Sequence, residues 1–145
     1  MIFFIQIPKG VKDKSDGYVR TDFPGGFPGD RRNAFTREGR TQAEHAMFDW
    51  LSTVLNWRKG NSVITKGDMV QFLPHNGFYA IARRYNGKTV FTIVNGTNSQ
   101  ASLSVERYAE ILNGKSFGKD ITTGKNVDLT SDIKFAPKQT MILEF

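Results

Sequence analysis

The sequence predicts a mainly β protein, an antiparallel β-sandwich of seven to eight strands preceded by a long loop and one α-helix. Two features carry this prediction. After Gly60, apolar runs are broken by turn signals at short intervals, which is typical of an antiparallel β domain. Before Gly60 stand a short apolar start, a stretch without periodicity and one clearly marked helix. We therefore predict two parts, residues 1–60 and residues 61–145.

The first residues, 2–7, are apolar apart from Gln6, and we interpret them as a strand. They lack the basic start and the small-residue cleavage site of a signal peptide, and the sequence indicates no compartment. Because no apolar run approaches the length of a membrane span, we expect no membrane partner.

A long stretch without periodicity, residues 15–40, follows and is rich in Gly, Pro, Asp and Arg. Loops of this length inside a domain are usually functional or disordered. Disordered segments rarely carry as many aromatic residues as Tyr18, Phe23, Phe27 and Phe35 provide here. We therefore interpret the stretch as an ordered loop that offers carboxylates, guanidinium groups and aromatic faces to a polar, ring-shaped ligand.

A helix is predicted over residues 41–59. Thr41 and Glu44 form a capping box, in which each side chain satisfies a free N–H group of the first turn. Arg58 and Lys59 stand at the other end, where cations suit the helix dipole, and Gly60 is expected at the C′ position.

One apolar stripe runs along this helix. Its members recur at helical spacing: Ala43, Met47, Trp50, Leu51, Val54 and Leu55. Trp50 and Trp57 lie two turns apart, and we predict that both pack the helix against the sheet, with a ligand role as the alternative.

The clearest hairpin signal lies in the β part, where Asn86-Gly87 joins strands 78–85 and 88–94. The second of these strands is apolar on both faces and should be central. Residues 63–73 are expected to form one or two strands, and residues 106–112 one or two helical turns. Turns are expected at 75–77 and 95–98. Further strands are expected at 101–105, at 120–125, where the strand ends in a turn, at 127–129, before Pro137 and at 140–145.

The composition excludes several classes of protein. Without Cys there is no disulfide framework, thiol nucleophile or zinc ribbon, and His45 and His75 lack ligand-like spacing. We expect no metal and no cofactor. The net charge of +6 is dispersed, with Arg31-Arg32 and Arg83-Arg84 as the closest clusters, and we expect no nucleic-acid partner.

No catalytic motif is present, and we predict no catalytic residue in this chain. The loop does hold three acidic residues, Asp16, Asp22 and Asp30, which would allow a carboxylate pair for glycoside hydrolysis. We favour turn formation and local ion pairs for them, with partners among Arg20, Arg31 and Arg32.

Several strings carry a family resemblance. They are D-G-Y-V-R at 16–20, D-F-P-G-G-F at 22–27, N-A-F-T at 33–36, G-R-T at 39–41, L-N-W-R-K-G at 55–60, F-Y-A-I-A-R at 78–83 and D-I-T-T-G at 120–124. Over residues 15–145 the chain resembles the C-terminal part of bacterial α-amylase-family glycoside hydrolases. The likeness is closest to the neopullulanase and cyclomaltodextrinase branch of gut Bacteroides-type bacteria.

In that family a (β/α)8 barrel carries the chemistry, and a β-sandwich follows its last helix. The resemblance implies that residues 1–60 are a remnant of the barrel end and that residues 61–145 are the sandwich. The loop would follow the eighth barrel strand, where an Asp and an Arg hold glucose units. Asp16 and Arg20 match that D-x-x-x-R pattern and are the predicted substrate-binding residues.

The chain also departs from the family. The family's catalytic carboxylates lie upstream of the eighth barrel strand and have no counterpart in this chain. Residues 1–14 do not resemble that strand. The resemblance therefore implies a fragment of an enzyme that hydrolyses α-1,4 or α-1,6 glucosidic bonds, as a truncated gene product or an engineered piece. We predict that the chain alone is inactive and that its parent enzyme, from the bacterial cytoplasm or periplasm, supplies the catalytic barrel as partner.

Two alternatives to an enzyme fragment stay open. A non-catalytic module would hold an α-glucan oligosaccharide by stacking exposed Phe23, Phe27 or Tyr79 on sugar rings. An interaction module would self-associate through the apolar helix face, which consists of Met47, Trp50, Leu51 and Val54.

Overall fold

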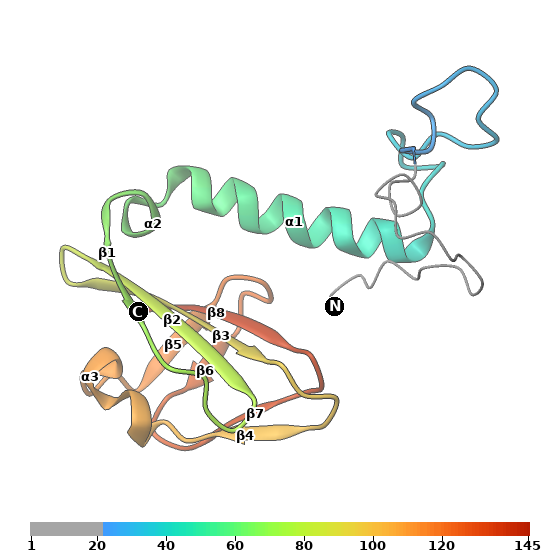
Figure 1. Ribbon diagram of the computed structural model, residues 1–145. Helices are drawn as coiled ribbons and strands as arrows, with labels where there is room; N and C mark the ends of the chain where they lie inside the picture. The colour runs from blue at the N-terminus through green and yellow to red at the C-terminus, as the bar shows by residue number, and fades with distance from the viewer. Residues whose placement is uncertain (1–21) are drawn as a thin grey trace. The chain divides into compact units, whose positions relative to one another are not determined.

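The structure is a computed structural model that describes residues 22–145 (Figure 1). The strand predicted at residues 2–7 therefore lies outside the described residues. The described chain falls into two units, residues 22–51 and Ser52–Phe145, which divide within helix α1 (Gln42–Gly60). The division predicted between residues 60 and 61 stays a prediction.

The unit Ser52–Phe145 is the predicted antiparallel β-sandwich, with eight strands among its residues. The strands are β1 (Asp68–Gln71), β2 (Phe78–Tyr85), β3 (Lys88–Asn95), β4 (Ala101–Leu103), β5 (Phe117–Asp120), β6 (Asn126–Asp128), β7 (Ile133–Phe135) and β8 (Thr140–Glu144). Six of them form one sheet in the order β1-β2-β3-β8-β5-β6, and β4 pairs with β7 in the second sheet.

The predicted hairpin forms as expected. Asn86 and Gly87 have φ angles of 50° and 75°, the left-handed conformation that a two-residue turn of this kind requires. Strands β2 and β3 pair from Phe78↔Asn95 to Tyr85↔Lys88. Strand β3 lies between β2 and β8 and is buried on both faces over most of its length, which confirms that it is central.

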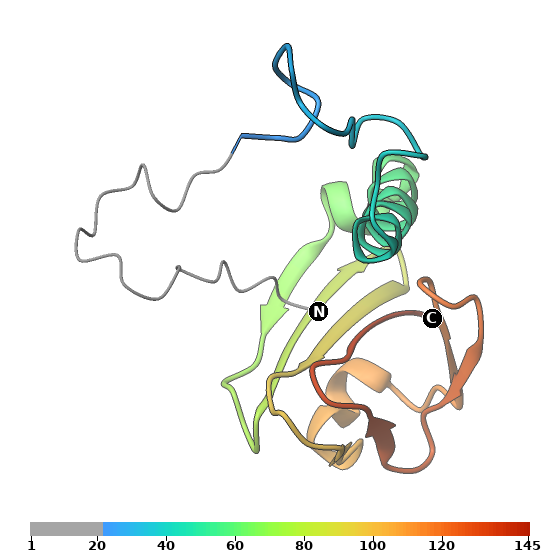
Figure 2. The same cartoon turned by 90° about the vertical axis from the view of Figure 1, so that its right-hand side faces the viewer.

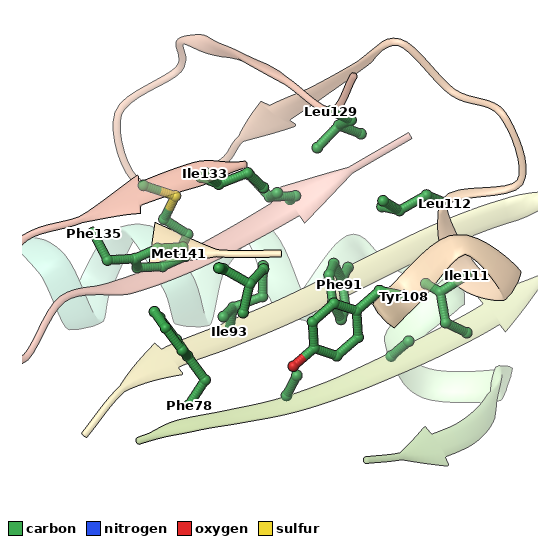
Figure 3. Packing of buried hydrophobic residues seen from close by; sticks show 14 residues of the cluster. Phe78, Phe91, Ile93, Tyr108, Ile111, Leu112, Leu129, Ile133, Phe135 and Met141 are labelled. Atoms are coloured by element: carbon green, nitrogen blue, oxygen red, sulfur yellow. The ribbon is translucent and has the colours of Figure 1, made fainter. Parts of the chain in front are cut away.

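The core lies between the six-stranded sheet and a layer made by β4, β7 and the short helical segment η2 (Glu106–Tyr108) and α3 (Ala109–Leu112) (Figure 3). The sheet curves around this segment (Figure 2). The predicted helical turns are thus confirmed, and they end at Asn113, whose φ is 46°. The Tyr108 ring packs against those of Phe72 and Phe91, with centroids at 4.9 and 5.2 Å, and so ties the segment to the sheet.

Helix α1 begins with the predicted capping box. The Glu44 backbone N–H donates to Thr41 Oγ1 at 3.3 Å, and the Thr41 N–H donates to Glu44 Oε2 at 2.8 Å. The prediction for its end is wrong, because α1 includes Gly60, which does not adopt a positive φ. Asn61 instead begins the next helix directly.

A short helix, α2 (Ser62–Lys66), replaces the first part of the strand predicted at 63–73. Asn61 caps it, since its side-chain oxygen accepts a hydrogen bond from the Val63 N–H at 2.9 Å. The β-branched Val63 is buried against Val90 and Ile142, on the face of the sheet opposite the main core. Tertiary packing therefore overrides the strand propensity of this apolar run.

A strand that ends in a turn was predicted at 120–125; the turn forms, but the strand is misplaced, because β5 ends at Asp120, where that prediction begins. The buried Asp120 carboxylate accepts hydrogen bonds from the Thr122 N–H at 3.0 Å and from the Thr123 hydroxyl at 2.9 Å. The Gly124 N–H donates to the Asp120 carbonyl at 2.7 Å. These bonds fold residues 121–124 into a turn.

Candidate functional site

The two predicted substrate-binding residues, Asp16 and Arg20, lie outside the described residues. The described part of the same loop, residues 22–40, is irregular and leads into α1. Asp30 is a turn-forming residue there, as favoured from the sequence. Its carboxylate accepts hydrogen bonds from the backbone N–H groups of Gly25 and Phe27 at 2.6 and 3.2 Å.

An ion pair joins the loop to the first turn of α1. The Arg32 guanidinium donates to both carboxylate oxygens of Glu44, at 2.6 and 2.8 Å, and to the Gly39 carbonyl at 3.1 Å. The expected partner of this arginine was a loop aspartate, and the structure gives it a helix glutamate instead. Hydrogen bonds from Arg32 and from the Thr41 backbone lower the pKa of Glu44 to about 2, and the pKa of Arg32 is raised.

An apolar pocket of about 460 Å³ opens between the loop and α1. The rings of Phe23 and Phe35 lie 4.6 Å apart on one side of it. The Arg40 guanidinium lies 3.7 Å from the centre of the Phe48 ring and donates to the Ala34 and Phe35 carbonyls at 2.8 and 2.9 Å. The arginine thus holds the loop against the helix, and the pocket offers mainly apolar surface to whatever covers it.

The three aromatic residues predicted to stack on sugar rings are all accessible. Phe23 and Phe27 are 54% and 60% exposed, and Tyr79 on β2 is 37% exposed. The first two belong to the unit that ends at Leu51, whereas Tyr79 belongs to the sandwich.

The apolar face of α1 is only partly covered. Trp50, expected to pack on the sheet, is 38% exposed, and Leu51 is exposed as well. Trp57 does pack as predicted, because together with Val54 it lies against the cluster of Val63, Val90 and Ile142. The helix residues predicted for self-association therefore differ in their burial.

Sequence reasoning did not predict the contact between the end of α1 and strand β8. The Trp57 indole N–H donates to Glu144 Oε1 at 2.9 Å, and the Asn61 amide donates to the same oxygen at 2.5 Å. Lys88 and Lys119 share the adjoining cleft of about 630 Å³. The partners are 87 residues apart, and no local signal pointed to the pairing.

A polar cleft of about 680 Å³ at one end of the sandwich was not predicted either. We call it the Tyr108 cleft. It lies where the turn before β2, strand β4, η2 and the residues before β7 meet. Its polar side chains include Ser102, Ser104, Glu106, Arg107, Tyr108 and Asp132. They come from a strand, a short helical segment and the residues between elements, and they show no motif spacing from which the cleft could be found.

Among residues 22–145, no group of three or more metal-ligating side chains comes together. In the same part of the chain, no helix combines the length and the apolar character that crossing a bilayer requires.

Residues 69–144 match a family model described as the cyclo-malto-dextrinase C-terminal domain. Solved structures share the fold. AmyP, solved in complex with maltose, superimposes with a TM-score of 0.60 at 16% identity over 72% of this chain. An α-amylase from Anoxybacillus gives 0.52 at 16% identity over 68%, and a variant of trehalulose synthase MutB in complex with Tris gives 0.52 at 15% over 64%.

This chain spans about a fifth of the length of these structures: it covers 21% of AmyP, 22% of the Anoxybacillus α-amylase and 17% of MutB. At such low identity the likeness concerns the fold alone.

Proposed function

The chain belongs to the family of cyclo-malto-dextrinase C-terminal domains, the β-sandwich part of α-amylase-family enzymes, and from this we propose that it serves as the accessory sandwich of an enzyme that hydrolyses α-1,4 or α-1,6 glucosidic bonds. The observation that carries the proposal is the family match over residues 69–144, which spans nearly the whole sandwich. The neopullulanase or cyclomaltodextrinase branch, a starch-derived substrate and a Bacteroides-type source are parts of this proposal.

The accessory role is supported by how α1 joins the sandwich. Val54 and Trp57 pack on the cluster of Val63, Val90 and Ile142. The Trp57 indole N–H also donates a hydrogen bond to Glu144 in β8. A helix whose end is anchored to the sheet can hold the sandwich in a fixed orientation against a preceding domain. The exposed residues earlier in α1, such as Phe48 and Leu51, provide the apolar surface that a catalytic barrel would cover.

Hydrolysis needs two positioned carboxylates, and we propose that the catalytic barrel supplies both. Asp16 and Arg20 are proposed to hold glucose units beside that centre, because a carboxylate and a guanidinium can each pair with two sugar hydroxyls. The purified chain should not turn over maltooligosaccharides, cyclodextrin or pullulan. Turnover well above that of a denatured sample would contradict the proposal.

A domain exchange tests the accessory role. Residues 52–145, which include the end of α1, are grafted in place of the corresponding residues of a cyclomaltodextrinase, and a truncated enzyme without them is the comparison. We expect the chimera to regain soluble expression and activity because the sandwich covers the same surface of the barrel. A chimera that behaves like the truncated enzyme would refute the role. A second chimera carrying Trp57 and Glu144 replaced by Phe and Gln tests whether the helix anchor is needed.

A non-catalytic α-glucan-binding module is the second candidate, and the exposed rings of Phe23, Phe27 and Tyr79 favour it. Calorimetry of the chain with maltoheptaose separates the two candidates, since a purely structural domain releases no heat of binding. Self-association through the exposed part of α1 is a further proposal. Sedimentation over a wide range of protein concentration tests it, and a monomer throughout would count against it.

A further inference from the structure

Four Asn-Gly dipeptides lie in the sandwich, and their asparagines are Asn76, Asn86, Asn95 and Asn113. We propose that Asn86 and Asn113 are sites of spontaneous deamidation in the folded chain, whereas the fold protects Asn95. The modification needs water and no enzyme. It is independent of the accessory role proposed above.

The reaction joins the asparagine side chain to the backbone nitrogen of the next residue. That nitrogen loses its proton to solvent and attacks the asparagine Cγ, and the new N–C bond closes a five-membered succinimide ring. The Cγ–Nδ2 bond breaks, and ammonia leaves. Water then opens the ring at either carbonyl, which gives aspartate or isoaspartate. A following glycine favours the reaction because it has no Cβ to shield the nitrogen and the widest conformational freedom.

Asn86 and Asn113 meet both demands of this reaction, which are access to solvent and room around the following glycine. Both asparagines are exposed, and so are Gly87 and Gly114. A Cβ placed on either glycine would meet no atom within 4 Å. Asn86 lies between β2 and β3, and Asn113 directly follows α3. Local opening costs least free energy at such exposed connections, so the side chain can turn toward the glycine nitrogen.

Asn95 has the same following residue and the opposite surroundings. Its side chain is fully buried, and its amide nitrogen donates to the Ser99 and Ala136 carbonyls at 2.9 Å each. The Gly96 N–H, which would have to lose its proton, donates to the Gly77 carbonyl at 2.8 Å. Ring closure therefore requires that this whole network opens first.

Asn76 lies between these two cases. It is exposed, but a Cβ on Gly77 would collide with the Thr97 side chain, and the Gly77 carbonyl accepts the hydrogen bond from Gly96. These contacts hold the turn against residues 96–97. We therefore expect Asn76 to react more slowly than Asn86 and Asn113 do.

The two reactive asparagines line one cleft of about 540 Å³, which we call the Asn113 cleft. Its charged side chains are two carboxylates and two cations: Asp68, Glu110, Arg84 and Lys88. Conversion of both asparagines adds two carboxylates, so the balanced cleft acquires a net charge of −2. The net charge of the chain falls at the same time from +6 to +4. Deamidation thus concentrates its effect on one end of the sandwich.

Peptide mapping by mass spectrometry measures the reaction at each site. The full chain is incubated for increasing times in mildly alkaline buffer made with water labelled with oxygen-18, so that only residues converted before digestion carry the label. We expect Asn95 to convert at least about tenfold more slowly than Asn86 and Asn113. Equal rates at Asn95 and the two cleft residues would overturn the proposal. So would conversion of neither cleft residue in the time that converts short peptides of the same sequence.

A denatured sample separates the effect of the fold from that of the sequence. In concentrated guanidinium chloride all four sites should react at similar rates, because no network protects Asn95 there. If Asn95 stayed equally slow in the denatured chain, its protection would come from the local sequence, and the role given to the fold would be wrong.

Matched variants test the charge change. The double variant Asn86→Gln and Asn113→Gln requires a six-membered ring at both sites, which closes far more slowly. On ion exchange, the unaltered chain should shift with time toward less basic species, and the double variant should lose most of this shift. Asn98→Gln, at an exposed asparagine followed by Ser99, is the control and should keep it. An undiminished shift in the double variant would overturn the two sites.

Discussion

Trp57 and Glu144 are joined by a hydrogen bond of 2.9 Å although 87 residues separate them in the chain. The bond connects the last turns of α1 to β8, a strand in the middle of the six-stranded sheet. Asn61, which caps α2, donates to the same carboxylate oxygen. One carboxylate thus fixes the end of one helix, the start of the next and the sheet.

Replacement of Glu144 by Ala should destabilise the sandwich by about 1–3 kcal/mol, because the partly buried Trp57 indole and Asn61 amide both lose their acceptor. Glu144→Gln keeps a carbonyl acceptor and should cost about 1 kcal/mol. Urea unfolding followed by Trp fluorescence measures both. Glu110→Ala, at an exposed position of α3, is the control and should change the free energy of unfolding by less than about 0.5 kcal/mol. Equal values for all three variants would contradict the anchoring role.

Replacement of Gly87 by Ala should destabilise the chain by about 1–2 kcal/mol, because a side chain is strained at its φ of 75°. Gly60→Ala is the matched control. A Cβ at either glycine meets no atom within 4 Å, so the backbone angle is what separates them. Gly60 lies in α1, and its replacement should stabilise the chain by about 0.5–1 kcal/mol. Thermal unfolding measures both, and a shift of the same sign for both variants would refute the turn assignment.

Acidification should weaken the link between Arg32 and Glu44. The folded-state pKa of Glu44, about 2, lies below its ordinary value of 4.5. The link therefore contributes fully above pH 4.5, and its contribution is lost as the pH falls from about 4.5 toward 2. Amide exchange at the start of α1 should accelerate in this window, and it should do so less in Glu44→Gln, which has nothing left to titrate. Identical pH profiles would contradict the role of Glu44, and the comparison is made at low salt because both side chains are accessible.

Replacement of Asn95 by Asp should destabilise the sandwich by about 3 kcal/mol or more. Asn95 is fully buried, and its side-chain amide donates to the Ser99 and Ala136 carbonyls at 2.9 Å each. An aspartate has no donor for them and places a charge in the core. The exposed Asn98→Asp is the control in urea unfolding, and similar midpoints for both variants would be inconsistent with this network. Asn95-Gly96-Thr97 matches the Asn-X-Thr glycosylation pattern, but the burial of Asn95 keeps its side chain from acting as an acceptor.

The sequence predicted best where the signal was local. Asn86-Gly87 fixes the φ angles of a two-residue turn, so the bounds of both flanking strands could be predicted almost to the residue. Thr41 and Glu44 are three residues apart, and the side chain of each accepts a hydrogen bond from the backbone N–H of the other. The start of α1 could therefore be predicted as well. In each case the residues that decide the structure are neighbours in the chain.

Short elements depended on contacts that the sequence does not display. The run after Asn61 has the β-branched residues of a strand, but its burial against Val90 and Ile142 makes it a helix. Asp120 was placed at the start of a strand that ends in a turn, whereas it is the last residue of β5 and its buried carboxylate folds the next residues directly into the turn. The Tyr108 cleft gathers residues from β2, β4, η2 and the connections near them, and no spacing along the chain points to it.

The position of β8 has a consequence for synthesis on the ribosome. Residues 140–144 lie between β3 and β5, so they join β1–β2–β3 to β5–β6 within the large sheet. Until residues 140–144 have been made, the backbone N–H and C=O groups on the facing edges of β3 and β5 lack the strand that pairs with them. Because β8 pairs with β3 across a long stretch of chain, we expect this pairing to form slowly, and a chain that lacks it exposes strand edges that favour aggregation.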